Sequence, residues 1–321
     1  MSHDLTQQTI IRKARQKSQK LIIGCRTWTN FQHAEGETLL RMLREGWFGG
    51  FILFSENCLE KQQLLDFTVA LQEATQERHF WISIDQEGGQ VARLDETFTP
   101  STPTALELGK TQSPRRYKGF DRQAKDLKTY GINLNFSPVA DLSLGSPVIM
   151  KKGRAFSRNP DEVVQWASSI ITAHLNQGIT PCLKHFPGHG SVPVDTHETF
   201  CKTHVKEDAV ELHPFRALHH HFPQVPVMVA HLIDPAIDPT LPATLSPKWQ
   251  SLFTKILPQR PPLISDDISM GAMNHLGSPA DILKRALKGP MDQVIFSQNA
   301  LANVHQQNPP IPFDHFPALL S

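Results

Sequence analysis

Short runs of β-branched and aromatic residues recur along the chain, and each is followed by a polar segment and then by a stretch of helical periodicity. Eight of these runs have the length of a strand: residues 20–25, 50–54, 80–84, 132–136, 180–183, 226–230, 263–265 and 293–296. Strands that alternate with helices from end to end indicate an α/β fold built on a parallel sheet.

Two of the intervening segments show clear helix signals. One face of residues 59–77 is apolar, and it is formed by Leu64, Phe67, Leu71 and Ala74. Residues 159–177 begin with Asn159, a favoured capping residue, followed by Pro160 in the first turn, and they end before Gly178. Both segments therefore predict helices between strands.

Eight strands can close into a barrel or wind into an open sheet. An open nucleotide-binding sheet usually carries a glycine-rich fingerprint after its first strand, and this chain has none there. A length of 321 residues also suits one barrel. We predict a single (β/α)8 barrel of the TIM type over residues 1–321. Its Pro-rich tail, residues 308–321, is expected to form either an ordered strap or a loose end.

The overall composition narrows the choice of partner and location. Apolar residues make up 39% of the chain, charged residues 20%, and the formal net charge is +1. This balance favours a small molecule such as a sugar over a nucleic acid. The first 20 residues contain no apolar signal core, and no later stretch has membrane-spanning length. We therefore expect a cytoplasmic protein with reduced cysteines, whose spacing matches no zinc motif.

The reactive side chains follow strands rather than helices. They lie in residues 85–93 after the third strand, residues 184–197 after the fifth, His231 after the sixth and residues 265–270 after the seventh. A lone Asp at a strand end is more often a turn or helix cap. Several such clusters together predict a site at the C-terminal mouth of the barrel, where barrel enzymes carry their chemistry.

Several of these segments resemble glycoside hydrolase family 3, specifically its single-domain β-N-acetylglucosaminidase branch of bacterial cell-wall recycling. The most specific are Lys-His-Phe-Pro-Gly-His-Gly at residues 184–190, Asp-Thr-His at 195–197 and Ser-Asp-Asp at 265–267. The resemblance spans nearly the whole chain. It implies a retaining exo-glycosidase that releases N-acetylglucosamine from β-linked sugars, with peptidoglycan (muropeptide) fragments as substrates. It also implies neither a metal nor a cofactor.

The resemblance also assigns roles to individual residues. Asp266 matches the family's nucleophile, and His197 and Asp195 match its acid/base dyad. Five further positions match residues that hold the N-acetylglucosamine ring: Asp85, Arg93, Arg154, Lys184 and His185.

These residue types suit the reaction. Retention requires a carboxylate that attacks the anomeric carbon and a group that first donates and later accepts a proton. Nearby cations such as Lys184 and Arg154 would keep Asp266 ionised. A histidine, with a reference pKa of about 6.5, exchanges protons near neutrality, and Asp195 would fix the tautomer of His197.

Two segments depart from the family's pattern. The chain has Lys-Lys-Gly-Arg at residues 151–154 where relatives carry a Gly-acidic-Arg turn. It has Gly-Pro-Met-Asp at residues 289–292 in place of Ala-Gly-small-Asp. These departures concern substrate fit and C-terminal packing more than the chemistry.

Two other functions compete with this interpretation. In a metal-dependent barrel hydrolase, the ligands would be His185, His189, Asp195 and His197. An inactive homologue would bind a sugar without cleaving it. Under the glycosidase hypothesis, we expect His189 to be a buried strut of its loop and Asp267 to be a helix cap.

Overall fold

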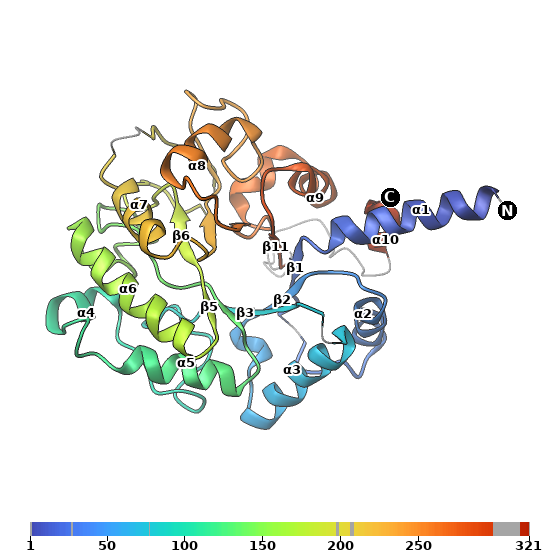
Figure 1. The fold of residues 1–321 in the computed structure, drawn as a ribbon, viewed down its shortest axis with the longest axis horizontal. Coiled ribbons are helices and arrows are strands. Elements are labelled where there is room, and N and C mark those ends of the chain that lie inside the picture. The colour runs from blue at the N-terminus through green and yellow to red at the C-terminus, as the bar shows by residue number, and fades with distance from the viewer. Residues whose placement is uncertain are drawn as a thin grey trace.

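The computed structural model describes residues 2–26, 28–76, 78–196, 199–205, 209–297 and 315–320. Its parallel strands surround a common axis, with helices outside them (Figure 1). The barrel strands are β1 (Leu21–Ile23), β2 (Gly50–Leu53), β3 (Trp81–Ile84), β4 (Leu134–Asn135), β5 (Thr180–Pro181), β6 (Leu183–Phe186), β8 (Val227–Val229), β10 (Leu263–Ser265) and β11 (Val294–Phe296).

The sheet closes on itself. Hydrogen-bonded neighbours run in the order β11-β1-β2-β3-β4-β5 and β10-β8-β6. The predicted fifth strand is interrupted at Cys182, so β5 and β6 occupy one position in the ring. The ring is completed between β10 and β11, where Ser265 N–H donates to the Gln293 carbonyl at 2.9 Å. The predicted (β/α)8 barrel is therefore confirmed, and the open sheet is wrong.

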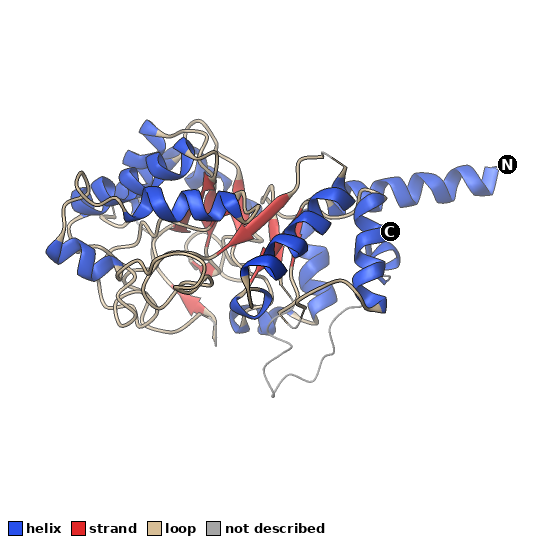
Figure 2. Ribbon diagram, turned by 90° about the horizontal axis from the view of Figure 1, so that it is seen from below, coloured by secondary structure: helices blue, strands red, loops and turns tan. Residues whose placement is uncertain are grey.

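Helices cover the outside of the barrel (Figure 2). They are α2 (Ala34–Arg44), α3 (Lys61–Thr75), α4 (Ala105–Thr111), α5 (Gly119–Thr129), α6 (Pro160–Asn176), α7 (Leu212–His221), α8 (Gln250–Ile256) and α9 (Pro279–Lys288), with the short helices η1 (Ser55–Asn57), η2 (Pro247–Trp249) and η3 (Gly271–Leu276). The first helix, α1 (Ser2–Ser18), instead projects away from the barrel toward the N-terminus. Among the described helices, none combines the length and apolar character needed to cross a membrane.

The two helices predicted from sequence signals are confirmed as α3 and α6. The apolar face of α3 is buried as expected. At the start of α6, the Asn159 side chain accepts a hydrogen bond from the Asp161 N–H at 2.9 Å. This capping bond satisfies a backbone donor that the first helical turn leaves without a partner.

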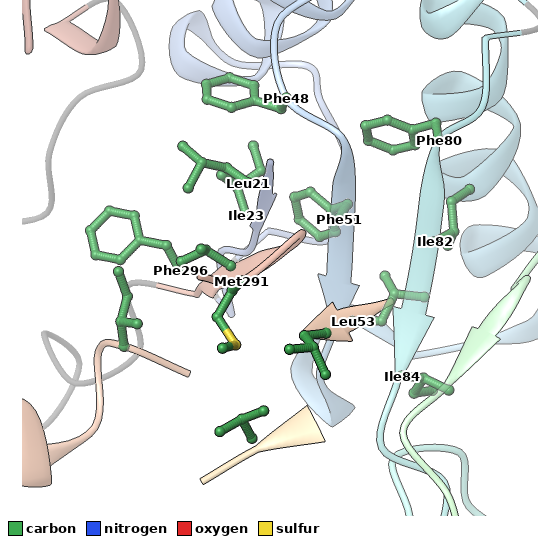
Figure 3. Close-up of a cluster of buried hydrophobic side chains, with 14 of the residues drawn as sticks. Leu21, Ile23, Phe48, Phe51, Leu53, Phe80, Ile82, Ile84, Met291 and Phe296 are labelled. Atoms are coloured by element: carbon green, nitrogen blue, oxygen red, sulfur yellow. The ribbon is translucent and has the colours of Figure 1, made fainter. Parts of the chain in front are cut away.

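The strands are apolar on both faces because both faces are buried. Side chains that point into the barrel include Ile22, Ile52, Phe136, Met228 and Ile264. Their neighbours along the strands pack outward against the helices, as Leu21, Ile23, Phe51 and Leu53 do in Figure 3. Parallel strands covered in this way give continuous apolar runs, which explains why strand positions were predictable from sequence.

Part of the Pro-rich tail is an ordered helix. α10 (Phe316–Leu320) lies beside α1 (Figure 1), and Lys17 Nζ donates to the Leu320 carbonyl at 3.2 Å. The Phe316 ring meets Phe48 edge-on at 5.2 Å. The strap interpretation thus applies to residues 315–320, whereas residues 308–314 and 321 lie outside the described part.

A short ladder near the barrel mouth was not predicted. β7 (Cys201–Lys202) pairs with β9 (Leu232–Ile233) and joins the segments that follow β6 and β8. Each strand has two residues, too few for a recognisable period-2 pattern.

Candidate active site

A cavity of about 350 Å³ opens where the barrel strands end at their carboxyl sides. Asp85 follows β3, Lys184 and His185 belong to β6, and Asp266 follows β10. The cavity lining contains six of the residues predicted from the sequence, namely Asp85, Arg93, Arg154, Lys184, His185 and Asp266. The structure thus brings together residues from distant parts of the chain.

Lys184 is the centre of a buried charge network. Its side chain is 2% exposed, and Nζ lies 2.7 Å from Asp85 Oδ1 and 2.6 Å from Glu87 Oε1. Glu87 also receives two hydrogen bonds from Arg154, at 2.7 and 2.8 Å. Arg93 Nη2 lies 3.4 Å from Asp85 Oδ2. Each carboxylate therefore contacts two cations, a paired arrangement that fixes all five side chains.

These pairings keep the network charged. Burial alone would raise the pKa of Asp85, but the charges of Lys184 and Arg93 hold it well below its ordinary value. Burial opposes ionisation of Glu87 as well, yet Arg154 and Lys184 lower its pKa to about 2. The pKa of Arg154 is raised by Glu87 against the opposing effect of burial. At neutral pH the cavity therefore offers fixed, ionised donors and acceptors to a polar ligand.

Asp141 organises the loop after β6. Its carboxylate is fully buried and lies 2.6 Å from His185 Nδ1. It also accepts hydrogen bonds from the backbone N–H of His189 at 2.7 Å and of His185 at 3.2 Å. Since Nδ1 faces a carboxylate and Arg154 donates to Nε2 at 3.2 Å, the hydrogen bonds assign the ring proton to Nδ1.

Sequence reasoning missed the roles of Glu87 and Asp141. Glu87 lies in the segment 85–93, and Asp141 follows the strand predicted at residues 132–136, but their partners are far away in the sequence. Glu87 and Arg154 are 67 residues apart, and Asp141 and His185 are 44 residues apart. A position just after an apolar strand was the available signal for both residues.

Asp266 and Asp267 lie side by side but have different surroundings. Both line the cavity. Asp266 Oδ1 accepts the Asp267 N–H at 2.8 Å. The Asp267 carboxylate instead binds the Ser269 N–H at 3.0 Å and both the N–H and the hydroxyl of Ser297. Asp267 therefore closes a turn and ties it to the end of β11. The expected helix cap is wrong, because η3 begins only at Gly271.

His189 lies within the loop as a buried strut would. Its side chain is 2% exposed, and Nε2 lies 2.9 Å from Thr196 Oγ1. Burial, helped by His185, lowers its pKa to about 4, so the ring is neutral at pH 7. Gly190 allows the loop to pass close to the barrel, since a Cβ there would lie 2.1 Å from the Leu142 carbonyl oxygen.

The predicted dyad is described only in part. Asp195 lies in the described loop but does not line the cavity, whereas the next residue, Thr196, does. The Ala272 N–H donates to the Thr196 carbonyl at 3.2 Å, which anchors this end of the loop on η3. The predicted acid/base, His197, lies outside the described residues.

The two segments that depart from the family's pattern, residues 151–154 and 289–292, each make defined local contacts. Gly153 adopts φ +65°, and the turn that it forms brings Arg154 into the cavity. Near the C-terminus, Asp292 Oδ2 accepts the Leu263 N–H at 2.8 Å and forms an ion pair with Arg260 at 3.0 Å. Both segments are thus integrated into the barrel.

The metal hypothesis named His185, His189, Asp195 and His197 as ligands. His185 makes hydrogen bonds to Asp141 and Arg154, and His189 lies within hydrogen-bonding distance of Thr196. In the part of the chain that the structure describes, no three His, Cys, Asp or Glu side chains are grouped as a metal site requires.

Comparison with known proteins identifies the family. The profile described as "Glycosyl hydrolase family 3 N terminal domain" matches residues 14–308. A β-hexosaminidase of Nitrosospira multiformis is 30% identical over 270 residues, which cover 81% of this chain and 76% of the relative. A β-hexosaminidase of Nitrosomonas eutropha is 34% identical over 258 residues, covering 77% of this chain and 73% of the relative.

Solved structures agree with this result. A family 3 β-N-acetylglucosaminidase from Paenibacillus sp. superposes with a TM-score of 0.79 at 26% identity, covering 90% of this chain and 56% of that one. A family 3 glycosyl hydrolase from Mycobacterium smegmatis gives a TM-score of 0.76 at 26% identity, covering 96% of this chain and 88% of that one. The resemblance inferred from the motifs is confirmed: the chain is a glycoside hydrolase that belongs to glycosyl hydrolase family 3.

Proposed function

We propose that the chain is a retaining β-N-acetylhexosaminidase that releases a terminal N-acetylglucosamine from β-linked sugars. The observation that carries the proposal is the cavity in which Asp266 lies with the charge network of Asp85, Glu87 and Lys184. Relatives named β-hexosaminidase support the same activity.

Asp266 is the nucleophile in this proposal. Its carboxylate attacks the anomeric carbon and forms a glycosyl ester, while the bond to the leaving oxygen breaks and that oxygen takes a proton from His197. Water then attacks the same carbon, gives its proton to His197 and releases Asp266. The hydrogen bond from the Asp267 N–H to Asp266 Oδ1 supports this role, because it orients the carboxylate.

His197, oriented by Asp195, is the proposed acid/base. Support comes from Thr196, which lines the cavity directly before His197 in sequence. Thr196 is held in two ways, by the hydrogen bond between its hydroxyl and His189 and by the Ala272 N–H that donates to its carbonyl. In this proposal, His197 reaches the glycosidic oxygen of the bound sugar from this loop.

The sugar ring is proposed to bind the charged groups inside the cavity. Carboxylates accept hydrogen bonds from hydroxyls, and lysine and arginine donate to ring substituents. The proposed binding residues are Asp85, Arg93, Arg154, Lys184 and His185. Their mutual contacts support this role, because a network already in place loses little entropy when the sugar binds.

The biological setting is also a proposal and rests on the resemblance. We propose that muropeptide fragments bearing N-acetylglucosamine are the natural substrates, that the reaction takes place in the cytoplasm, and that residues 1–321 act as one catalytic domain. Release of N-acetylglucosamine from purified muropeptides, followed by mass spectrometry, tests the first point. Cell fractionation with an antibody tests the second.

The deciding experiment is hydrolysis of 4-nitrophenyl N-acetyl-β-glucosaminide, with the product anomer followed by NMR. We expect turnover and a β-anomer as first product, and α-anomer as first product would contradict retention. Binding of N-acetylglucosamine without turnover would instead support the inactive homologue. Loss of activity with a chelator, restored by zinc, would support the metal-dependent hydrolase.

A further inference from the structure

The cations that line the cavity differ in whether they form an ion pair. Arg93, Arg154 and Lys184 each form an ion pair with a carboxylate inside the cavity. Lys152 also lines the cavity, but its side chain is exposed. Within the described residues it forms no ion pair.

The backbone beneath Lys152 is fixed. The Met150 N–H donates to the Ser146 carbonyl at 2.8 Å, and the Arg154 N–H donates to the Ile149 carbonyl at 2.9 Å. The carbonyl of Gly153 in turn accepts the Leu106 N–H at 3.1 Å. The turn therefore holds Lys152 at the cavity even though its side chain remains in solvent.

Lys152 and Arg154 lie at different depths of one cavity. The Arg154 side chain is 9% exposed and binds Glu87 inside, whereas Lys152 is exposed. An exo-glycosidase of the kind proposed above buries the terminal sugar, so the remainder of the substrate leaves through the mouth. Lys152 is thus placed to meet the aglycone rather than the terminal sugar.

In the described part of the chain, the other charged residues that line the cavity form no ion pair with Lys152. Arg26 lines the same cavity and lies 3.4 Å from Glu56, in a pair whose side chains are 39% and 51% exposed. The lining carboxylates of the described chain have other contacts or the proposed catalytic role. They are Asp85 and Glu87 in the buried network, Asp267 in its turn, and Asp266.

We propose that Lys152 is a specificity-determining residue that selects substrates whose aglycone carries a carboxylate. The inference rests on the proposed glycosidase function and adds the charge of the leaving part. A lysine ammonium is a compact charge on a flexible stem, which suits a carboxylate whose position varies between aglycones. An exposed pair of this kind changes an equilibrium about two- to five-fold.

The test compares two substrates that differ in charge but little in leaving-group ability. They are the 4-(carboxymethyl)phenyl and 4-(carbamoylmethyl)phenyl N-acetyl-β-glucosaminides, in which a methylene insulates the phenol from the charge. The measured quantity is the ratio of their kcat/KM values. We expect Lys152→Gln to lower this ratio about two- to five-fold, and Lys152→Glu to lower it further.

Lys151 is the matched control. It carries the same charge one residue earlier and is exposed, but it does not line the cavity. Lys151→Gln should keep the wild-type ratio. Raising NaCl from about 0.05 M to about 0.5 M should shift the wild-type ratio toward that of Lys152→Gln, because salt screens an exposed pair.

An equal ratio in wild type and Lys152→Gln would overturn the inference, as would an equal drop in Lys151→Gln. If wild type cleaves neither glycoside, the proposed function fails. The charge preference is then measured by calorimetric binding of the same two compounds. Equal relative affinities in wild type and Lys152→Gln would overturn the inference by itself.

Discussion

Lys184 Nζ lies 2.7 Å from Asp85 Oδ1, although the two residues are 99 positions apart in the sequence. The contact joins β6 to the segment after β3 inside the cavity. Removing both charges from water is costly, and the pair persists because Glu87 and Arg93 supply further opposite charges. The geometry of the cavity therefore depends on the whole network rather than on one pair.

Lys184→Met tests the network as a structural element. The change leaves Asp85 and Glu87 buried without their shared cation, and breaking a buried ion pair costs roughly 3–5 kcal/mol. Urea unfolding should show a loss of that size in the free energy of unfolding. Lys151→Met, which removes an exposed lysine, should change it by less than about 0.5 kcal/mol. A similar small change for both variants would contradict the structural role.

The lowered pKa of Glu87 predicts that the free energy of unfolding depends on pH in the acid range. Its pKa in the folded protein is lowered to about 2, below the ordinary value of 4.5. A carboxyl group with a lowered folded pKa stabilises the protein above its unfolded pKa, and this contribution is lost as the pH falls from about 4.5 toward about 2. Stability should therefore decline across this window.

Glu87→Gln isolates that contribution. The variant should be less stable than wild type at pH 7, because Arg154 loses its charged partner. The difference in the free energy of unfolding should shrink as the pH falls from about 4.5 toward about 2, where wild-type Glu87 becomes protonated. Denaturant titrations at several pH values measure it. A difference that does not vary with pH would show that the ionised form gives no added stability.

Asp266→Ala should lower kcat by at least about 10³-fold, because removal of a nucleophile abolishes the covalent route. Binding of N-acetylglucosamine, measured by calorimetry, should remain. A slow 5-fluoro glycosyl donor should label Asp266 in wild type, as located by fragmentation mass spectrometry. Asp267→Asn is the neighbouring control, since Asp267 is engaged with Ser269 and Ser297. Labelling at another residue would show that Asp266 is not the nucleophile.

The substrate's own acetamido group is the alternative nucleophile within the same reaction class, assisted by Asp266 and Asp267. Glycosides in which a hydroxyl replaces the acetamide separate the two routes. Hydrolysis of such a substrate with retention would mean that the acetamide is not required. Loss of turnover on it, together with absence of a covalent adduct, would favour the alternative.

Sequence patterns predicted the parts of this protein that depend on local order. Strand positions followed from apolar runs buried on both faces, and the α6 start followed from Asn159. Asp85, Lys184 and Asp266 were predicted to converge because each lies at or beyond a strand end. The partners of Asp141 and Glu87 were not predictable in this way, because these contacts form only when the ends of β3, β4 and β6 meet the Arg154 turn. Periodicity carries no information on such long-range contacts.

The proposed dyad makes a prediction that depends on the leaving group. General acid catalysis contributes roughly 10²- to 10⁴-fold, mostly for leaving groups that must be protonated. A dinitrophenolate leaves without a proton, whereas the alkoxide of a disaccharide does not. Asp195→Asn keeps the imidazole of His197 but removes the charge that would fix its tautomer. It should therefore lower turnover of the disaccharide more than turnover of the dinitrophenyl glycoside. This difference between the two substrates should be smaller than in a variant that lacks His197.

His197→Ala should lose far more activity on the disaccharide than on the dinitrophenyl glycoside. On the latter, the glycosyl-enzyme should accumulate, because the attacking water now lacks a base, and azide should restore turnover by forming the β-glycosyl azide. Burst kinetics and product NMR measure both effects. His189→Ala is the control, since this buried ring is neutral at pH 7 and lies 2.9 Å from Thr196. If His189→Ala shows the leaving-group dependence and His197→Ala loses equally on both substrates, the acid lies in residues 184–190 instead.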